Sequence, residues 1–127
     1  MTPDMRLLAY AAVLCWVMVV TASTVRIRGN VVLGAGNRDD VPPPSALGDR
    51  ADRAAKNMLE NMVLFTALLF AARAGDGDAD RIVLGARIFF WSRVAYFPVY
   101  LVGIKFLRTA IYAVSLVGLA LIFSSIL

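Results

Sequence analysis

The sequence predicts an all-α integral membrane protein, a four-helix bundle that forms a single domain over residues 1–127. Of its residues 60% are hydrophobic, well above the roughly 45 to 50% of a soluble domain. A helix needs about 20 residues to cross the hydrocarbon core of a bilayer. On length alone the first, third and fourth of the four apolar segments qualify, the segments being 7–25, 58–72, 82–104 and 110–127.

The first helix is expected at about 5–27. A cleaved signal peptide is the rival interpretation, because Arg6 precedes the apolar run and residues 20–22 resemble a small-residue cleavage site. Asp4 is unusual in the leading segment of a signal peptide, and the apolar run is longer than such peptides need. These two features favour a retained transmembrane helix.

The second apolar segment is short, so its helix must begin before the segment if it is to span the bilayer. Asp49 and Asp52 suit the positive end of a helix dipole, and the prolines at 42–44 end any earlier structure. We therefore expect a helix whose first turns are polar. The second, third and fourth helices are predicted at about 49–73, 80–104 and 107–127.

The cationic residues of the connections predict the orientation. Most of these cations lie in the connection between the first and second helices. The connection between the third and fourth helices adds Lys105 and Arg108. The second connection sets three aspartates against Arg73 and Arg81. The positive-inside rule then places the first and third connections in the cytoplasm and both termini outside. Since these charges form no basic stripe with interleaved aromatics, we expect no nucleic acid partner.

A polar stripe marks the start of the second helix. It consists of Arg53, Lys56, Asn57 and Glu60. Their spacing of i, i+3, i+4 and i+7 puts them on one helix face. An ionised group at membrane depth costs about 2.5 to 3.5 kcal/mol on insertion scales, so the stripe should face protein or water. In the structural alternative the cations snorkel to the interface and Glu60 pairs with Lys56 only to hold the bundle.

The third helix repeats this pattern with Arg93, Tyr96 and Tyr100 at i, i+3 and i+7. Glu60 is the only carboxylate in the four apolar runs, so we predict a Glu60–Arg93 ion pair between the second and third helices. Pro98 removes a backbone donor, which either kinks the helix or lets polar groups collect nearby. As an alternative, the two tyrosines belong to an interfacial aromatic belt.

Two further residues of the apolar runs have simpler interpretations. Cys15, the single cysteine, is interpreted as a small buried hydrophobe, and one cysteine excludes a disulfide within the chain. Arg87 lies near the outer end of the third helix and is interpreted as a snorkelling anchor. With no histidine and one cysteine, no metal site is expected.

These motifs resemble the membrane-associated proteins in eicosanoid and glutathione metabolism, the MAPEG family, and are similar to its bacterial members. The resemblance covers nearly the whole chain through "VRIR" at 25–28, "RAAKNMLEN" at 53–61, "RVAYFPVYLVG" at 93–103 and "LRT" at 107–109. It implies a homotrimer of four-helix subunits that binds glutathione as cosubstrate between neighbouring subunits, near the cytoplasmic face of a bacterial inner membrane.

The resemblance also implies which residues hold glutathione. Arg108 and Arg26 correspond to arginines proposed to stabilise the thiolate. Glutathione carries two carboxylates, an ammonium group and a thiol, so its site needs several cations and at least one acid, which the polar residues supply. The chain departs from some members at Lys56, at Tyr96 and in a connection before Arg108 that is one residue shorter. The implied binding residues are Arg53, Lys56, Asn57, Glu60, Arg93, Tyr96 and Tyr100.

The expected function is that of a membrane-embedded glutathione transferase or peroxidase, acting on lipophilic electrophiles that arrive from the lipid bilayer. The alternative is a non-catalytic lipid-binding or scaffold protein of the same fold. A small four-helix exporter is disfavoured, because such exporters carry an essential acid in the first helix and none occurs in 7–25.

Overall fold

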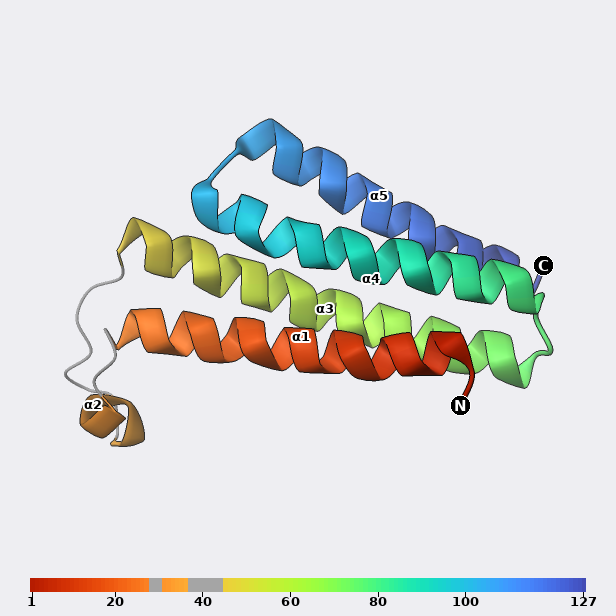
Figure 1. The fold of residues 1–127 in the computed structure, drawn as a ribbon, viewed down its shortest axis with the longest axis horizontal. Coiled ribbons are helices and arrows are strands. Elements are labelled where there is room, and N and C mark those ends of the chain that lie inside the picture. Colours follow the sequence, from red (N-terminus) through yellow and green to blue (C-terminus); the bar gives the residue numbers. More distant parts are fainter. Residues whose placement is uncertain (28–30, 37–44) are drawn as a thin grey trace.

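The computed structural model describes residues 1–27, 31–36 and 45–127. Four long helices lie side by side, and a short helix follows the first of them (Figure 1). The all-α four-helix fold is confirmed, whereas the short helix was not predicted. Arg28 and Arg38 of the first connection lie outside the described residues. The helices are α1 (Pro3–Arg26), α2 (Val31–Ala35), α3 (Ala46–Ala74), α4 (Ala79–Val102) and α5 (Lys105–Ser124).

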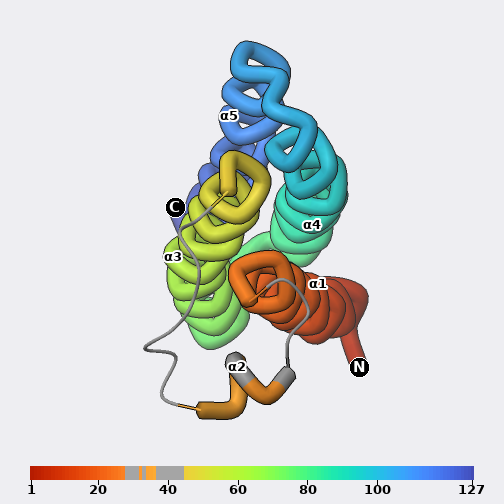
Figure 2. The backbone as a smooth tube through the Cα atoms, turned by 90° about the vertical axis from the view of Figure 1, so that its left-hand side faces the viewer, coloured from red at the N-terminus to blue at the C-terminus, as the bar shows by residue number. Residues whose placement is uncertain are grey.

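The four long helices form two closely packed pairs. α1 packs chiefly against α3, and α4 packs chiefly against α5. Figure 2 shows that α1 and α5 lie at opposite edges of the bundle, with α3 and α4 between them. The N-terminus and the C-terminus lie at the same end, and α2 lies at the other end (Figure 1).

Three helices, α1, α4 and α5, are long and apolar enough to cross a membrane. They correspond to the three apolar segments expected to do so. α3 has 29 residues, which at about 1.5 Å per residue makes it on the order of 43 Å long. Because the hydrocarbon core is about 30 Å thick, α3 is long enough to cross it with its polar first turns outside.

Local capping groups set the helix ends. The Ser45 hydroxyl accepts a hydrogen bond from the backbone N–H of Gly48 at 2.9 Å, so α3 begins before the predicted residue 49. The Asp78 carboxylate accepts one from the N–H of Asp80 at the start of α4. Gly103 has a left-handed φ of 87°, which ends α4 before the predicted residue 104.

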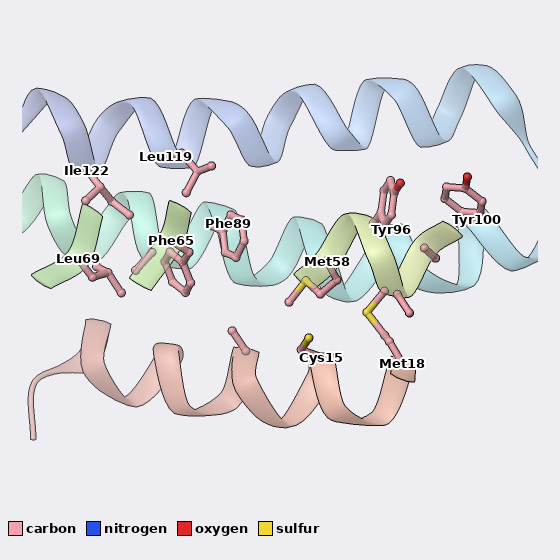
Figure 3. Packing of buried hydrophobic residues seen from close by; sticks show 14 of the residues in the cluster. Cys15, Met18, Met58, Phe65, Leu69, Phe89, Tyr96, Tyr100, Leu119 and Ile122 are labelled. Carbon is pink, nitrogen blue, oxygen red and sulfur yellow. The ribbon is translucent and has the colours of Figure 1, made fainter. Parts of the chain in front are cut away.

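The core lies between the four long helices. Figure 3 shows Cys15 and Met18 of α1 directed toward the buried side of α3, where Met58 lies. Farther along, the rings of Phe65 and Phe89 stack with their centroids 4.2 Å apart. Cys15 is buried, which confirms its interpretation as a small core hydrophobe.

Two glycines let α4 and α5 approach closely. A Cβ atom at Gly118 would lie 2.7 Å from the carbonyl oxygen of Gly85 and 2.8 Å from the backbone nitrogen of Phe89. A Cβ atom at Gly85 would meet the carbonyl oxygen of Gly118 at 2.6 Å. Backbone atoms cannot move aside as a side chain can, so this crossing requires glycine on both helices.

An ion pair joins the start of α1 to the end of α3. The Arg73 guanidinium donates from Nε to Asp4 Oδ2 at 2.9 Å, and from Nη2 to Asp4 Oδ1. The Asp4 side chain is 0% exposed and that of Arg73 is 30% exposed. Neither residue was predicted to pair, because the two are 69 positions apart in the sequence and only the packing of α1 on α3 brings them together.

A second arginine holds the opposite end of the bundle. Arg50 of α3 donates from Nε to the carbonyl oxygen of Leu101 at 3.0 Å. That carbonyl is among the last four of α4, which have no partner within their own helix. α4 continues through Pro98 to Val102, so the Arg50 contact is made at the end of the helix, one turn beyond Pro98.

We predict that Gly118→Ala destabilises the α4–α5 pair, because the added methyl group would overlap the backbone of α4. Overpacking of this kind costs about 1 to 3 kcal/mol. Thermal unfolding of the solubilised protein should show a lower midpoint. Gly36→Ala is the matched control, since its Cβ atom would meet nothing closer than 3.7 Å. Equal midpoints for the two variants would contradict the close crossing.

We also predict that Arg73→Met destabilises the fold by about 3 kcal/mol, because it leaves the buried Asp4 carboxylate without its partner. The double variant Asp4→Leu with Arg73→Met should recover much of that loss, since it removes the unpaired charge. Denaturation of both variants under the same conditions measures the difference. If the single variant is as stable as the double variant, the ion pair does not join α1 to α3.

Candidate functional site

The residues of the polar stripe of α3 differ in how far they are buried. Arg53, Lys56 and Glu60 are exposed, whereas Asn57 is half-buried. At about 100° per residue, Glu60 lies roughly 200° around the helix from the fully buried Met58. The four residues lie within about 100° of one another around the helix, as their spacing predicts, and Asn57 is at the edge of this face that meets Arg93 of α4. The other three point away from the subunit core.

The predicted Glu60–Arg93 ion pair is wrong. Arg93 is 0% exposed and donates from Nη2 to Asn57 Oδ1 at 2.6 Å. Its Nε lies 3.4 Å from the sulfur of Met58. Within the described part of the chain, Arg93 forms no ion pair. Glu60 is exposed and lies on the side of α3 opposite Met58, which contacts Arg93.

Aromatic rings take the place of a carboxylate around Arg93. Its guanidinium carbon lies 4.2 Å from the ring centroid of Tyr96 and 5.9 Å from that of Tyr112. Such rings attract a cation through the negative charge of their faces, and the attraction is stronger where water is excluded. Nη1 of Arg93 has no hydrogen-bond partner among the described residues.

A pocket of about 230 Å³ opens next to this cluster, where α3, α4 and α5 meet. It contains four of the predicted site residues. Thr109 and Tyr112 also line it and were not predicted, although Tyr112 lies one turn after Arg108 on the same helix and this spacing could have indicated it. The pocket is lined by Asn57, Tyr96, Tyr100, Arg108, Thr109 and Tyr112.

The aromatic side chains of the pocket connect α4 to Arg108. Tyr96 and Tyr100 are one turn apart on α4, and their rings meet edge to face with centroids 5.4 Å apart. Figure 3 shows both phenol rings in the space between α4 and α5. The guanidinium carbon of Arg108 lies 4.7 Å from the Tyr100 ring centroid. The half-buried Arg108 is therefore held over Tyr100 in the first turn of α5.

The remaining predicted arginine, Arg26, lies elsewhere in the subunit. It is the last residue of α1, is half-buried, and does not line this pocket. Figures 1 and 2 show that the end of α1 and the start of α5 are on opposite sides of α3. One subunit thus does not bring Arg26 and Arg108 together.

The pocket has the chemistry of an anion site. The guanidinium of Arg108 can only donate hydrogen bonds, while the phenol hydroxyls and the amide of Asn57 add neutral polar groups. A carboxylate or a thiolate is the kind of group that these donors stabilise. Within the described ranges, no three His, Cys, Asp or Glu side chains are grouped to hold a metal ion.

Comparison with known proteins gives one match. The model of the MAPEG family matches residues 7–127, nearly the whole chain. No curated protein and no solved structure matches the chain. The four-helix fold, the three helices apolar enough to span a membrane and this match agree with one another. The chain is an integral membrane protein that belongs to the MAPEG family.

Proposed function

We propose that this protein binds glutathione as a cosubstrate and acts as a glutathione transferase or peroxidase on lipophilic electrophiles. The observation that carries the proposal is the pocket in which Arg108 lies over Tyr100, beside Asn57 and Tyr96. Family membership supports a glutathione-related function. A cation held in a partly buried polar pocket is the group that a thiol needs to react as a thiolate at neutral pH.

The charge balance supports glutathione over a simple anion. Glutathione has two carboxylates and one ammonium group, so a single arginine does not match it. The exposed face of α3 adds Arg53, Lys56 and Glu60, which supply two cations and one acid. In our proposal, these residues hold the charged ends of glutathione while the pocket holds the thiol end.

A homotrimer would bring these two groups of residues together. In one subunit the face of α3 that bears Arg53, Lys56 and Glu60 is directed away from the core. Charged side chains that face lipid are costly, so a neighbouring subunit that covers this face would remove the cost. Covering it would also allow Arg26 of one subunit to approach Arg108 of the next.

In the proposed reaction, Arg108 lowers the pKa of the bound thiol by favouring the anion. The thiol loses its proton to water, and the sulfur attacks the electrophilic carbon as the leaving group departs. A free thiol has a pKa of about 8.5, so a value below 7 requires roughly 2 kcal/mol of differential stabilisation. A charged hydrogen bond in a partly desolvated site supplies this amount.

An apolar groove between α4 and α5 supports a lipophilic second substrate. It has a volume of about 280 Å³ and is lined by Ile88, Trp91, Ser92, Ala95, Ile111 and Val114. Such a groove could equally hold a lipid chain in a non-catalytic protein, which is the alternative function. We further propose an inner-membrane orientation with the α4–α5 connection in the cytoplasm, which follows from the cations of the first and third connections.

The trimer can be tested in native-like lipid discs. Cross-linking should give a three-subunit species, and Glu60→Gln should reduce its fraction in detergent, because Arg53 and Lys56 would then share the covered face without an acid. We expect about a tenfold weaker association. Asp76→Asn, in the exposed α3–α4 connection, is the matched control. Finding only monomers of the unchanged protein would contradict the trimer.

The role of Arg108 can be tested by ultraviolet thiolate absorbance when glutathione is titrated at pH 7 into wild type, Arg108→Ala and Arg26→Ala. We expect wild type to form thiolate and Arg108→Ala to lose it, with a fall of at least about tenfold in kcat/KM for a lipophilic electrophile. Lys105→Ala is the control, since it removes an exposed cation one turn earlier.

The same titration separates the two candidate functions. If wild type binds glutathione but neither forms thiolate nor conjugates the electrophile, the protein binds without catalysing. If it binds no glutathione at all, the proposed cosubstrate is wrong. A loss of thiolate in Arg26→Ala alone would transfer the role from Arg108 to Arg26.

A further inference from the structure

Arg93 has an unusual position for a residue implied to bind a ligand. It is 0% exposed and is absent from the residues that line the pocket. Three of its contacts are nevertheless with lining residues, since it bonds to Asn57 and lies over Tyr96 and near Tyr112. Arg93 therefore lies behind the pocket wall, where it can act on a ligand only through other side chains.

The contact with Asn57 fixes the orientation of the amide. A guanidinium group has only hydrogen-bond donors, so the atom of Asn57 that meets it at 2.6 Å must be the carbonyl oxygen. The contact with Arg93 therefore does not use the amide NH₂ of Asn57, which makes no hydrogen bond within the described part of the chain. Asn57 lines the pocket, so this unused donor is available to a ligand there.

The same arginine anchors the aromatic wall. Tyr96 lies under the Arg93 guanidinium at 4.2 Å, Tyr100 meets Tyr96 edge to face, and Arg108 lies over Tyr100. These contacts form a continuous chain from Arg93 to Arg108. A displacement of Arg93 would therefore reach both Asn57 and, through two rings, Arg108.

We propose that Arg93 is a positioning residue, which holds the Asn57 amide with its NH₂ group available to the pocket, so that the site selects a ligand with an acceptor oxygen at that point. The inference rests on the proposed function for the identity of the ligand. The acceptor would be a carbonyl or carboxylate oxygen of glutathione. A ligand with a donor at that point would be rejected, because both groups would be donors.

Asn57→Asp tests the inference while keeping the fold. Aspartate at this position retains, and strengthens, the contact with Arg93, but it presents an acceptor to the pocket in place of a donor. We expect affinity for glutathione, measured by calorimetry on the protein in lipid discs, to fall about ten- to hundredfold, with no fall in melting temperature. Wild-type affinity in this variant would overturn the proposal.

A double-mutant cycle tests whether Arg93 acts through Asn57. Arg93→Met and Asn57→Ala should each weaken glutathione binding by about tenfold. The dissociation constant of the double variant should exceed that of the weaker-binding single variant by no more than about threefold. If the two losses of affinity multiply in the double variant, the two residues act independently and the proposal is overturned. Arg93→Lys keeps a donor for Asn57 and should recover most of the affinity. Arg87→Met, on the exposed side of the same helix, should bind as wild type.

A measurement without ligand separates this inference from the proposed function. With heavy nitrogen only at asparagine, the Asn57 side-chain NH₂ resonance is identified by its loss in Asn57→Ala. It should shift or broaden in Arg93→Met and stay in place in Arg87→Met. If wild type binds no glutathione, the proposed function and the ligand selection both fail. The position of the Asn57 NH₂ resonance in Arg93→Met would still show whether Arg93 orients Asn57. A resonance unchanged in Arg93→Met would overturn that role.

Discussion

The burial of one full charge, on Arg93, is the constraint around which α3, α4 and α5 are arranged. A guanidinium group with no carboxylate partner in the described structure must be stabilised by other means. Asn57 supplies a carbonyl oxygen, and the faces of Tyr96 and Tyr112 supply negative charge density. Those three side chains come from three helices, so accommodating the charge also fixes how the helices are rotated relative to one another. The pocket is lined by the same side chains, and its shape follows from that rotation.

Close packing and paired ends hold this arrangement in place. The backbones of α4 and α5 touch at Gly85 and Gly118, which brings Tyr112 of α5 near Arg93 of α4. At one end of the bundle Asp4 and Arg73 join α1 to α3, and at the other Arg50 of α3 bonds to the end of α4. In an apolar solvent, the hydrophobic effect gives little preference among helix rotations, so polar contacts and small residues carry more of the specificity.

Charges on the bundle surface have a different role from the buried ones. Arg53, Lys56 and Glu60 satisfy no polar group of the subunit core, and they are exposed along one face of α3. An apolar groove of about 490 Å³ continues along the same helix beside Leu59, Met62, Val63, Thr66 and Ala67. An apolar groove in a membrane protein can face lipid, whereas the three charged side chains need protein or water around them. The charges therefore agree with the proposal that a neighbouring subunit covers this face.

The sequence by itself determined the long helices and named four of the residues that line the pocket, because both depend on local pattern. The lengths of the apolar segments predicted three of the long helices, and the polar residues before the second segment predicted the other. The motif around Tyr96 and Tyr100 predicted two residues that line the pocket. Helix ends were less accurate because capping by Ser45 and Gly103 is decided by single residues. Only the tertiary structure decided the partners of the charges. Spacing along a helix gives the relative directions of its side chains but not which direction meets a neighbour, so Arg93 was assigned to Glu60 when packing gave it Asn57.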